Sequence, residues 1–298
     1  MLLSRFIREG AAALGAIYPE REASALMTAL CSELLGTKSY SHILNPEEEI
    51  ASDAFPRVQE ALSRLLNGEP LQYITGVKEF YCRRFTVNPS VLIPRPETEI
   101  LVREAALRLL NIEGSREALD LCTGSGCIAW SLALEVPGAR ITAVDISEDA
   151  LATASGQSFP DEPEGWTAPV FVKADILESG APDLFPAGNF DVLVSNPPYI
   201  RESEKAAMQR NVLDFEPSLA LFVPDDDPLL FYRAVAAIGA RALKPGGWGI
   251  VEINEELGDG VADVFRHAGF GKIEKIPDFF GKNRFVSFEK AHPEAAQG

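Results

Sequence analysis

The spacing of apolar residues divides the chain into two parts. Up to about residue 70, apolar residues recur every three or four positions, which is typical of helices with one buried face. Pro19 and Gly36 suit the start and the end of a helix, and Asn45 suits an N-cap. We therefore expect three helices, over residues 2–17, 19–36 and 45–70.

The pattern changes after residue 70. Residues 71–94 alternate between apolar and polar and contain turn signals, which predicts a hairpin-like connector, and residues 95–112 follow as a helix. Strand and helix patterns then alternate, which predicts a parallel, doubly wound sheet. The expected strands are 117–124, 140–147, 168–177, 190–198 and 248–254, and the expected helices are 126–136, 148–159, 227–243 and 258–269. Two last strands, 272–279 and 284–290, are expected to pair as an antiparallel edge.

These elements predict an α/β fold with a second, smaller domain. The main domain should hold a seven-stranded Rossmann-like sheet with an antiparallel edge, beside a small N-terminal helical bundle. We expect a helical domain over 1–73, a β-hairpin connector over 74–91 and the catalytic domain over 92–290. The tail, residues 291–298, is expected to be disordered.

Composition narrows the possible partners. The chain has 298 residues, 46% of them hydrophobic, with 44 acidic against 27 basic residues and a net charge of -17. Proteins that neutralise many phosphates carry a basic face, so we expect no direct nucleic-acid binding. No apolar run reaches the roughly 18 residues of a membrane span, so we expect no membrane partner. We expect a monomer.

Cysteine and histidine usage argues against a metal. The four cysteines form no CxxC pair and the three histidines are too few for a zinc cluster, so no metal is expected. Free thiols are typical of a reducing cytosol, and we expect a cytoplasmic protein.

A glycine-rich turn follows the first strand of the sheet. In "LDLCTGSGCIA", residues 119–129, Gly124 and Gly126 allow a tight turn and close approach of a ligand to the backbone. Asp145 ends the next strand about 20 residues later, where a carboxylate can accept both hydroxyls of a ribose. Asp175 ends the third strand and could take the exocyclic amine of an adenine. Each aspartate could instead be a solvated helix cap, but their convergence at one sheet edge predicts a nucleoside site.

The fourth strand ends in "VSNPPYI", residues 194–200. Pro197 and Pro198 have a fixed φ and no N–H, so this loop is rigid and offers acceptors. Asn196 adds a side-chain carbonyl and Tyr199 a flat face. Such a loop suits a planar –NH2 group held by the Asn196 side-chain oxygen and the Pro197 carbonyl, ready to attack an electrophilic methyl. The alternative is a rigid turn without chemistry.

Asn196–Tyr199 resembles the [NDS]PP[YFW] motif of S-adenosylmethionine-dependent methyltransferases that modify planar amino groups, and "DLCTGSG" resembles their first motif, DxGxGxG, with Cys122 in place of a glycine. Residues 71–81, 92–102, 215–222 and 281–288 resemble the HemK/PrmC-type release factor glutamine methyltransferases. The resemblance covers nearly the whole chain. It implies methyl transfer to the glutamine side chain in the Gly-Gly-Gln tip of class 1 peptide chain release factors, an event of translation termination. S-adenosylmethionine would be the cofactor, S-adenosylhomocysteine the product and the release factor the partner.

The resemblance also assigns roles. It implies that Asn196, Pro197, Pro198 and Tyr199 hold the glutamine, that Asp145 holds the ribose, and that Asp175 and Ile176 lie by the adenine. Asn196 would border the cofactor too. The methionine end would be lined by Cys122, Thr123, Gly124, Ser125 and Gly126.

Two further segments are open. Arg95, Glu97 and Glu99 either lie near the active site or simply start a helix, and Glu216 with Pro217 either shape a loop over the crevice or form a plain surface loop. Two rival functions are an adenine methyltransferase acting on nucleic acid and a catalytically silent nucleoside-binding protein. The acidic balance disfavours the first and the intact Asn-Pro-Pro-Tyr loop the second.

Overall fold

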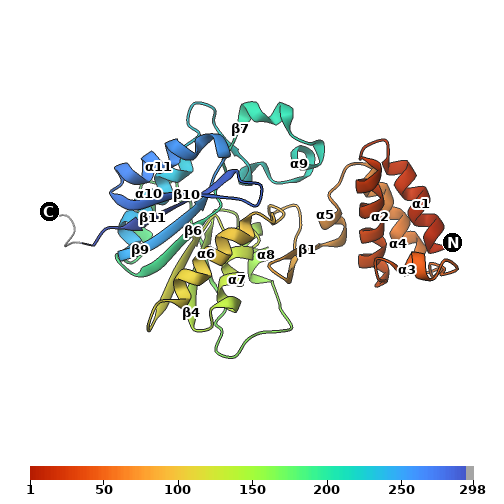
Figure 1. Ribbon diagram of the computed structural model, residues 1–298, viewed down its shortest axis with the longest axis horizontal. Helices are drawn as coiled ribbons and strands as arrows, with labels where there is room; N and C mark the ends of the chain where they lie inside the picture. Colours follow the sequence, from red (N-terminus) through yellow and green to blue (C-terminus); the bar gives the residue numbers. More distant parts are fainter. Residues whose placement is uncertain (293–298) are drawn as a thin grey trace. The chain divides into compact units, whose positions relative to one another are not determined.

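We describe the protein from a computed structural model, which covers residues 1–292. The chain forms two compact units (Figure 1). One holds Met1–Val77 together with Met208–Phe215, and the other holds Lys78–Ala207 and the chain from Glu216 onward. We call them the helical unit and the catalytic-type unit. The tail predicted to be disordered lies, from residue 293, outside the described residues.

The helical unit is built around one apolar core. Its helices are α1 (Leu3–Leu14), α2 (Glu20–Leu35), α3 (Ser41–Leu44), α4 (Phe55–Leu66), α5 (Leu71–Thr75) and α9 (Arg210–Phe215). Leu14 of α1, Met27 and Leu30 of α2, and Leu65 of α4 are fully buried in this core. Gly36 ends α2 with a left-handed φ of 67°, as its glycine predicts.

The third predicted helix begins later than expected. Asn45 does not cap it, since α4 starts at Phe55 and Asn45 instead follows α3. The backbone between them pairs with the N-terminus: Leu3 donates to the Glu48 carbonyl, and Ile50 donates to the carbonyl of Met1. This long-range pairing outweighs the local helix signal of the segment.

The connector is a hairpin preceded by a helix turn. Strands β1 (Val77–Phe80) and β2 (Arg83–Thr86) are joined through Tyr81 and Cys82, which both have positive φ, as a tight hairpin turn requires. Phe80 of β1 and Phe85 of β2 are fully buried. The prediction was wrong for residues 71–75, which form α5.

The predicted seven-stranded sheet is confirmed. Its order is β10-β11-β9-β6-β3-β4-β5, with β9, β6, β3, β4 and β5 parallel and β11 antiparallel to both β9 and β10. The bounds are β3 (Arg116–Leu121), β4 (Ala139–Asp145), β5 (Val170–Lys173), β6 (Phe190–Ser195), β9 (Leu243–Glu252), β10 (Phe270–Pro277) and β11 (Asn283–Lys290). β9 takes in the "KPGG" segment that we expected to precede it, with an irregular register opposite β6.

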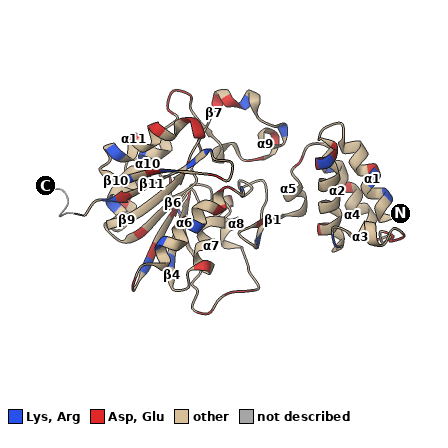
Figure 2. Cartoon of the chain, in the orientation of Figure 1, with Lys and Arg blue, Asp and Glu red and all other residues tan. Residues whose placement is uncertain are grey.

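Helices cover both faces of the sheet (Figure 1). They are α6 (Thr98–Leu110), α7 (Cys127–Glu135) and α8 (Glu148–Ser155) on one side, and α10 (Leu230–Ala242) and α11 (Gly258–His267) on the other. Two separate buried clusters fill the layers, and in the second the rings of Phe265 and Phe288 stack at 3.9 Å. Charged residues lie mainly on helices and loops, with acidic and basic residues interspersed (Figure 2).

Two short strands and a 3-10 helix follow β6 in the chain. Strands β7 (Ile200–Arg201) and β8 (Phe222–Val223) pair in parallel, and the 3-10 helix η2 (Glu202–Ala207) follows β7. Within residues 1–292, no helix is long and apolar enough to cross a membrane.

Candidate functional site

A cavity of about 340 Å³ lies at the carboxyl ends of four neighbouring strands, β6, β3, β4 and β5. This size falls within the usual range of ligand pockets, and the position is where open α/β sheets bind ligands. Most of the predicted site residues line it: Cys122, Thr123, Gly124, Ser125, Asp145, Asp175, Ile176, Asn196 and Pro198. Gly126, Pro197 and Tyr199 do not belong to its lining.

The glycine-rich turn takes left-handed backbone at three positions. Cys122, Gly124 and Gly126 have φ of 61°, 54° and 76°. A Cβ on Gly124 would meet no atom within 4 Å, so the space beside this backbone opens to the cavity, whereas one on Gly126 would crowd Trp130 and Ala154 at 3.0 Å. The two glycines therefore serve different needs, ligand approach at Gly124 and helix packing at Gly126.

The buried Asp120 holds the turn from below. Its carboxylate is fully buried and accepts a hydrogen bond from the Thr123 hydroxyl at 2.6 Å. Burial raises the pKa of Asp120 to about 7, although the Thr123 hydrogen bond opposes this rise.

Asp145 ends β4 and faces the turn. Its carboxylate accepts backbone N–H bonds from Gly124 at 2.8 Å and Ser147 at 3.0 Å. Burial raises the pKa of Asp145, and these backbone bonds counter the rise. The side chain thus lies at the cavity with backbone donors fixing its orientation.

Asp175 and Ile176 lie at the third strand end, but β5 itself ends two residues earlier, at Lys173. Asp175 accepts the backbone N–H of Leu177 at 2.9 Å, and Ile176 is buried with 6% exposure. The short loop brings both residues to the cavity wall, a polar group next to an apolar one.

The Asn-Pro-Pro-Tyr loop continues from β6. The Asn196 side-chain nitrogen donates to the Thr98 hydroxyl at 3.4 Å, and the Tyr199 hydroxyl donates to Glu252 at 3.1 Å. The Tyr199 ring packs against the apolar cluster under α10 and α11. Burial raises the pKa of the Tyr199 hydroxyl, and the nearby Glu252 carboxylate raises it further.

The two segments whose role the sequence left undecided contact each other at this site. Arg95 forms an ion pair with Glu216 at 2.7 Å, and Glu216 also accepts the backbone N–H of Ile93 at 3.2 Å. Arg95 and Pro217 line the cavity. Glu99 instead accepts the backbone N–H of Tyr81 at 2.9 Å and so braces the hairpin.

Sequence reasoning missed Thr98 and Glu252. Thr98 is the first residue of α6 and lines the cavity, and Glu252 is the last residue of β9; both are 2% exposed. Burial raises the pKa of Glu252, while hydrogen bonds from Thr98 and Tyr199 lower it. One signal was available, because an acidic residue at the carboxyl end of the apolar strand "WGIVE" is placed at the ligand edge of the sheet.

Within residues 1–292, no three His, Cys, Asp or Glu side chains are grouped so as to hold a metal ion. The cavity is lined by backbone, hydroxyl, amide and carboxylate groups together with apolar side chains.

Known proteins resemble the chain over nearly its whole length. A family model of the PrmC N-terminal domain matches residues 6–76, and one of the methyltransferase small domain matches residues 98–215. The release factor glutamine methyltransferase of Bacteroides thetaiotaomicron is 39% identical over 96% of this chain and 98% of that protein. The Koribacter versatilis protein of the same name is 42% identical over 81% of this chain and 82% of its own.

A solved structure adds to these similarities. The release-factor-specific protein-(glutamine-N5) methyltransferase of Alicyclobacillus acidocaldarius is 29% identical. The match covers 70% of this chain and 99% of that chain, with a TM-score of 0.41.

Proposed function

Because the chain belongs to the release factor glutamine methyltransferase family, we propose that it methylates the glutamine of the Gly-Gly-Gln motif in class 1 peptide chain release factors. The methyl group goes from S-adenosylmethionine to the side-chain amide nitrogen. The observation that carries the proposal is that Asn196 and Pro198 share one cavity with the glycine-rich turn and Asp145. The loop Asn196–Tyr199, which we call the acceptor loop, is thus next to a site that suits a nucleoside.

The cavity residues suit S-adenosylmethionine. The open space beside Gly124 admits a ligand against the backbone, and Cys122 to Ser125 would surround its methionine end. Asp145 would accept the ribose hydroxyls, and Asp175 with Ile176 would border the adenine. When bound, this cofactor supplies an electrophilic methyl on a sulfonium, which leaves as the neutral thioether S-adenosylhomocysteine.

The acceptor loop holds the nucleophile. An amide nitrogen is weakly nucleophilic because its lone pair is delocalised. Two acceptors, the Asn196 side-chain oxygen and the Pro197 carbonyl, would fix its two hydrogens and stabilise positive charge as the N–C bond forms. One proton then leaves the nitrogen for water. Orientation of the amide and stabilisation of the developing charge would then suffice, and no covalent enzyme intermediate is needed.

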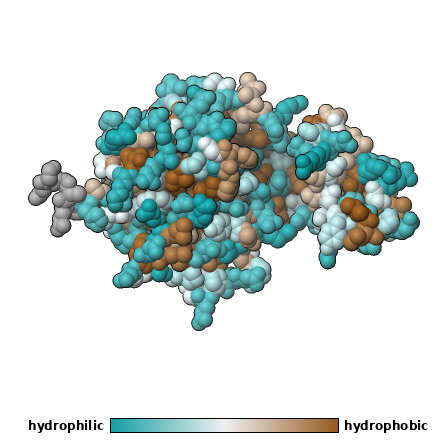
Figure 3. All heavy atoms as spheres, in the orientation of Figure 1, coloured by the Kyte–Doolittle hydropathy of each residue, from teal (hydrophilic) through white to brown (hydrophobic). Residues whose placement is uncertain are grey.

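The helical unit is proposed to bind the release factor. It exposes Ile43 and Leu44, each at 69%, and apolar residues are visible on its surface in Figure 3. Apolar side chains gathered at a protein surface often mark contact sites. Since release factors act on ribosomes, we propose the cytoplasm as the place of action. The monomeric state and the assignment of residues 1–73 to recognition stay predictions.

Transfer of a labelled methyl group tests the proposal. The protein is incubated with methyl-labelled S-adenosylmethionine and either a class 1 release factor or adenine-containing DNA. We expect label in the release factor; label only in DNA would contradict the proposal and support the adenine rival.

Asn196→Ala separates catalysis from cofactor binding. The variant should bind S-adenosylmethionine within a few-fold of the wild type but lose most turnover, because only the acceptor loop changes. Turnover at the wild-type level would show that the acceptor mechanism is wrong. A wild type that binds the cofactor but transfers no methyl group would instead support the silent binding protein.

A further inference from the structure

A chain of hydrogen bonds links the acceptor loop to two buried side chains from other segments. The side-chain nitrogen of Asn196, just after β6, donates to the hydroxyl of Thr98 at the start of α6. The Thr98 hydroxyl donates to Glu252 Oε2, at the end of β9, over 2.7 Å. Thr98 and Glu252 are both 2% exposed, so water cannot easily replace either partner.

Hydrogen-bonding capacity gives this line a direction. A threonine hydroxyl has one proton to donate, and here that proton goes to Glu252 Oε2. Once Thr98 donates to Glu252, it has only lone pairs for Asn196. The Asn196 amide must then turn its –NH2 toward Thr98, which leaves its carbonyl oxygen for the cavity. The buried carboxylate thereby determines which atom of the asparagine is offered to a substrate.

We propose that Thr98 and Glu252 are positioning residues, which hold the Asn196 side-chain oxygen toward the nitrogen that receives the methyl group. The inference rests on the proposed function, because amide orientation matters only if Asn196 binds an acceptor –NH2. A reversed asparagine would direct N–H groups at the N–H groups of the substrate. It would lose the charge stabilisation that the acceptor loop provides.

Glu252 also braces the other end of the loop. Its second oxygen, Oε1, accepts the Tyr199 hydroxyl at 3.1 Å, and its backbone carbonyl accepts the hydroxyl of Tyr232 at 3.1 Å. One carboxylate therefore contacts the last residue of the Asn-Pro-Pro-Tyr segment directly and the first through Thr98. This arrangement fixes the loop at both ends.

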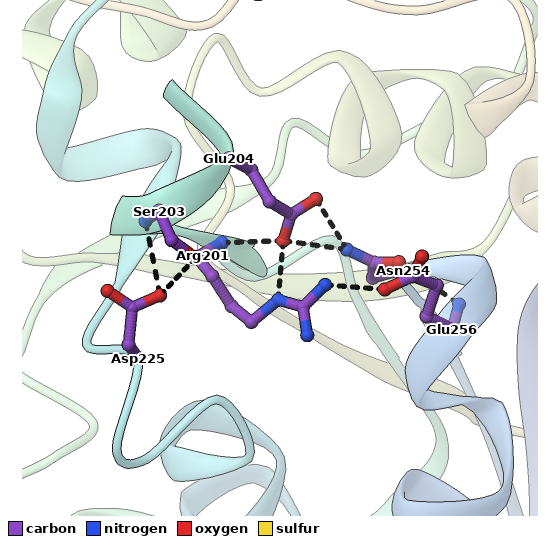
Figure 4. A network of polar contacts seen from close by, with 6 residues as sticks. All are labelled: Arg201, Ser203, Glu204, Asp225, Asn254 and Glu256. Carbon is purple, nitrogen blue, oxygen red and sulfur yellow. Dashed lines mark hydrogen bonds and ion pairs between the residues drawn. The ribbon is translucent and has the colours of Figure 1, made fainter. Parts of the chain in front are cut away.

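Residues just after Glu252 contact the segment that follows the acceptor loop. Arg201 lies between Glu204 and Glu256 (Figure 4). It donates to Glu204 over 2.8 Å and to Glu256 over 2.5 Å, and Asn254 donates to Glu204 over 3.3 Å. Arg201 lies two residues after Tyr199. The carboxyl end of β9 and the residues that follow it therefore contact both ends of the acceptor loop and the segment just after it.

The test compares Thr98→Val with Thr98→Ser. Valine keeps the shape of threonine but removes the hydroxyl, and serine keeps the hydroxyl. We expect Thr98→Val to lower kcat for release factor methylation on the order of 10- to 100-fold. KM for the release factor and S-adenosylmethionine affinity should stay within a few-fold, and Thr98→Ser should restore most of kcat. Thr86→Val, at an exposed position on β2, is the control for the same substitution elsewhere and should match the wild type.

Glu252→Gln is the second variant, in case Thr98→Val fails to fold. Glutamine keeps the size but can donate to Thr98, which frees the hydroxyl proton for Asn196 and allows the amide to reverse. We expect a comparable loss of kcat with cofactor binding retained. Wild-type kcat in the folded variants would overturn the inference, as would equal losses in Thr98→Val and Thr98→Ser.

Failure of the proposed function is seen separately, in the wild type. If the wild type transfers methyl to adenine in DNA and not to the release factor, the proposed function fails. The ratio of Thr98→Val to Thr98→Ser turnover on that acceptor still decides the positioning role, because adenine also presents a planar –NH2. A lowered ratio supports the role and a ratio near one rejects it.

Discussion

Cys122 is a non-glycine residue in left-handed backbone, at a position where the related motif has glycine. Its φ is 61°, and its side chain packs against the cluster beneath α10 and α11. Left-handed backbone is most costly for a β-branched side chain. We expect Cys122→Val to lower the free energy of unfolding by about 1–2 kcal/mol more than Cys122→Ala does. Urea unfolding checks this, and equal losses in the two variants would show that the turn relaxes freely.

Asp120 should make stability depend on pH. Its folded-state pKa is raised from 3.8 to about 7, so the folded protein holds this proton more tightly than the unfolded chain does. The contribution is fully present below about pH 4 and is lost as pH rises through about 7. Relative to Asp120→Asn, which cannot ionise, the wild type should become less stable over that range. A pH-independent difference between the two unfolding free energies would contradict this.

At the scale of residues, the sequence predicted the site groups that lie at the carboxyl ends of recognisable strands. Gly124, Asp145 and Asn196 each lie at or just after the carboxyl end of a strand, and parallel strands bring their carboxyl ends to one edge. Thr98 and Glu252 are 154 residues apart, and only their packing behind the loop shows that they belong together. Contacts between distant segments of this kind need the folded structure.

The packing of α7 against α8 gives a matched pair of glycine variants. Trp130 of α7 donates its ring N–H to the Ala154 carbonyl of α8 at 2.8 Å, and Gly126 lies against both residues. Gly126→Ala should therefore cost about 1–3 kcal/mol of stability through crowding and backbone strain. In Gly124→Ala the added methyl group contacts no atom within 4 Å, so the only stability loss comes from the left-handed φ. This variant should mainly weaken S-adenosylmethionine binding, because the methyl group points into the cavity. Calorimetric titration and thermal unfolding of both variants separate the effects; a greater stability loss for Gly124→Ala would contradict them.

At the scale of elements, strand and helix alternation was sufficient to predict the sheet and its helices. Two of the misplaced boundaries share one cause. The start of α4 and the start of β9 both depend on pairing with distant backbone, Glu48 and Ile50 with the N-terminus and Leu243 with Phe190. Local cap and turn signals such as Asn45 cannot report such pairing.

At the scale of the whole molecule, the proposed cofactor site and the proposed substrate recognition belong to different units. Every residue that lines the cavity belongs to the catalytic-type unit. A chain that begins at residue 78 should therefore bind S-adenosylmethionine within a few-fold of the full protein, provided that circular dichroism shows it folded. It should methylate the release factor far more slowly, because it lacks Met1–Val77, which is most of the helical unit. Full-rate methylation by the folded truncated chain would show that the helical unit is not the recognition domain.

The most direct test of the central claim is mass spectrometry of the release factor peptide that contains the Gly-Gly-Gln motif. The release factor is treated with S-adenosylmethionine and either the wild-type protein or Asn196→Ala, and the peptide is fragmented to locate the added mass. We predict one methyl group on the glutamine side chain after treatment with the wild type and almost none with the variant. An unmodified glutamine, or a methyl group on another residue, would contradict the account.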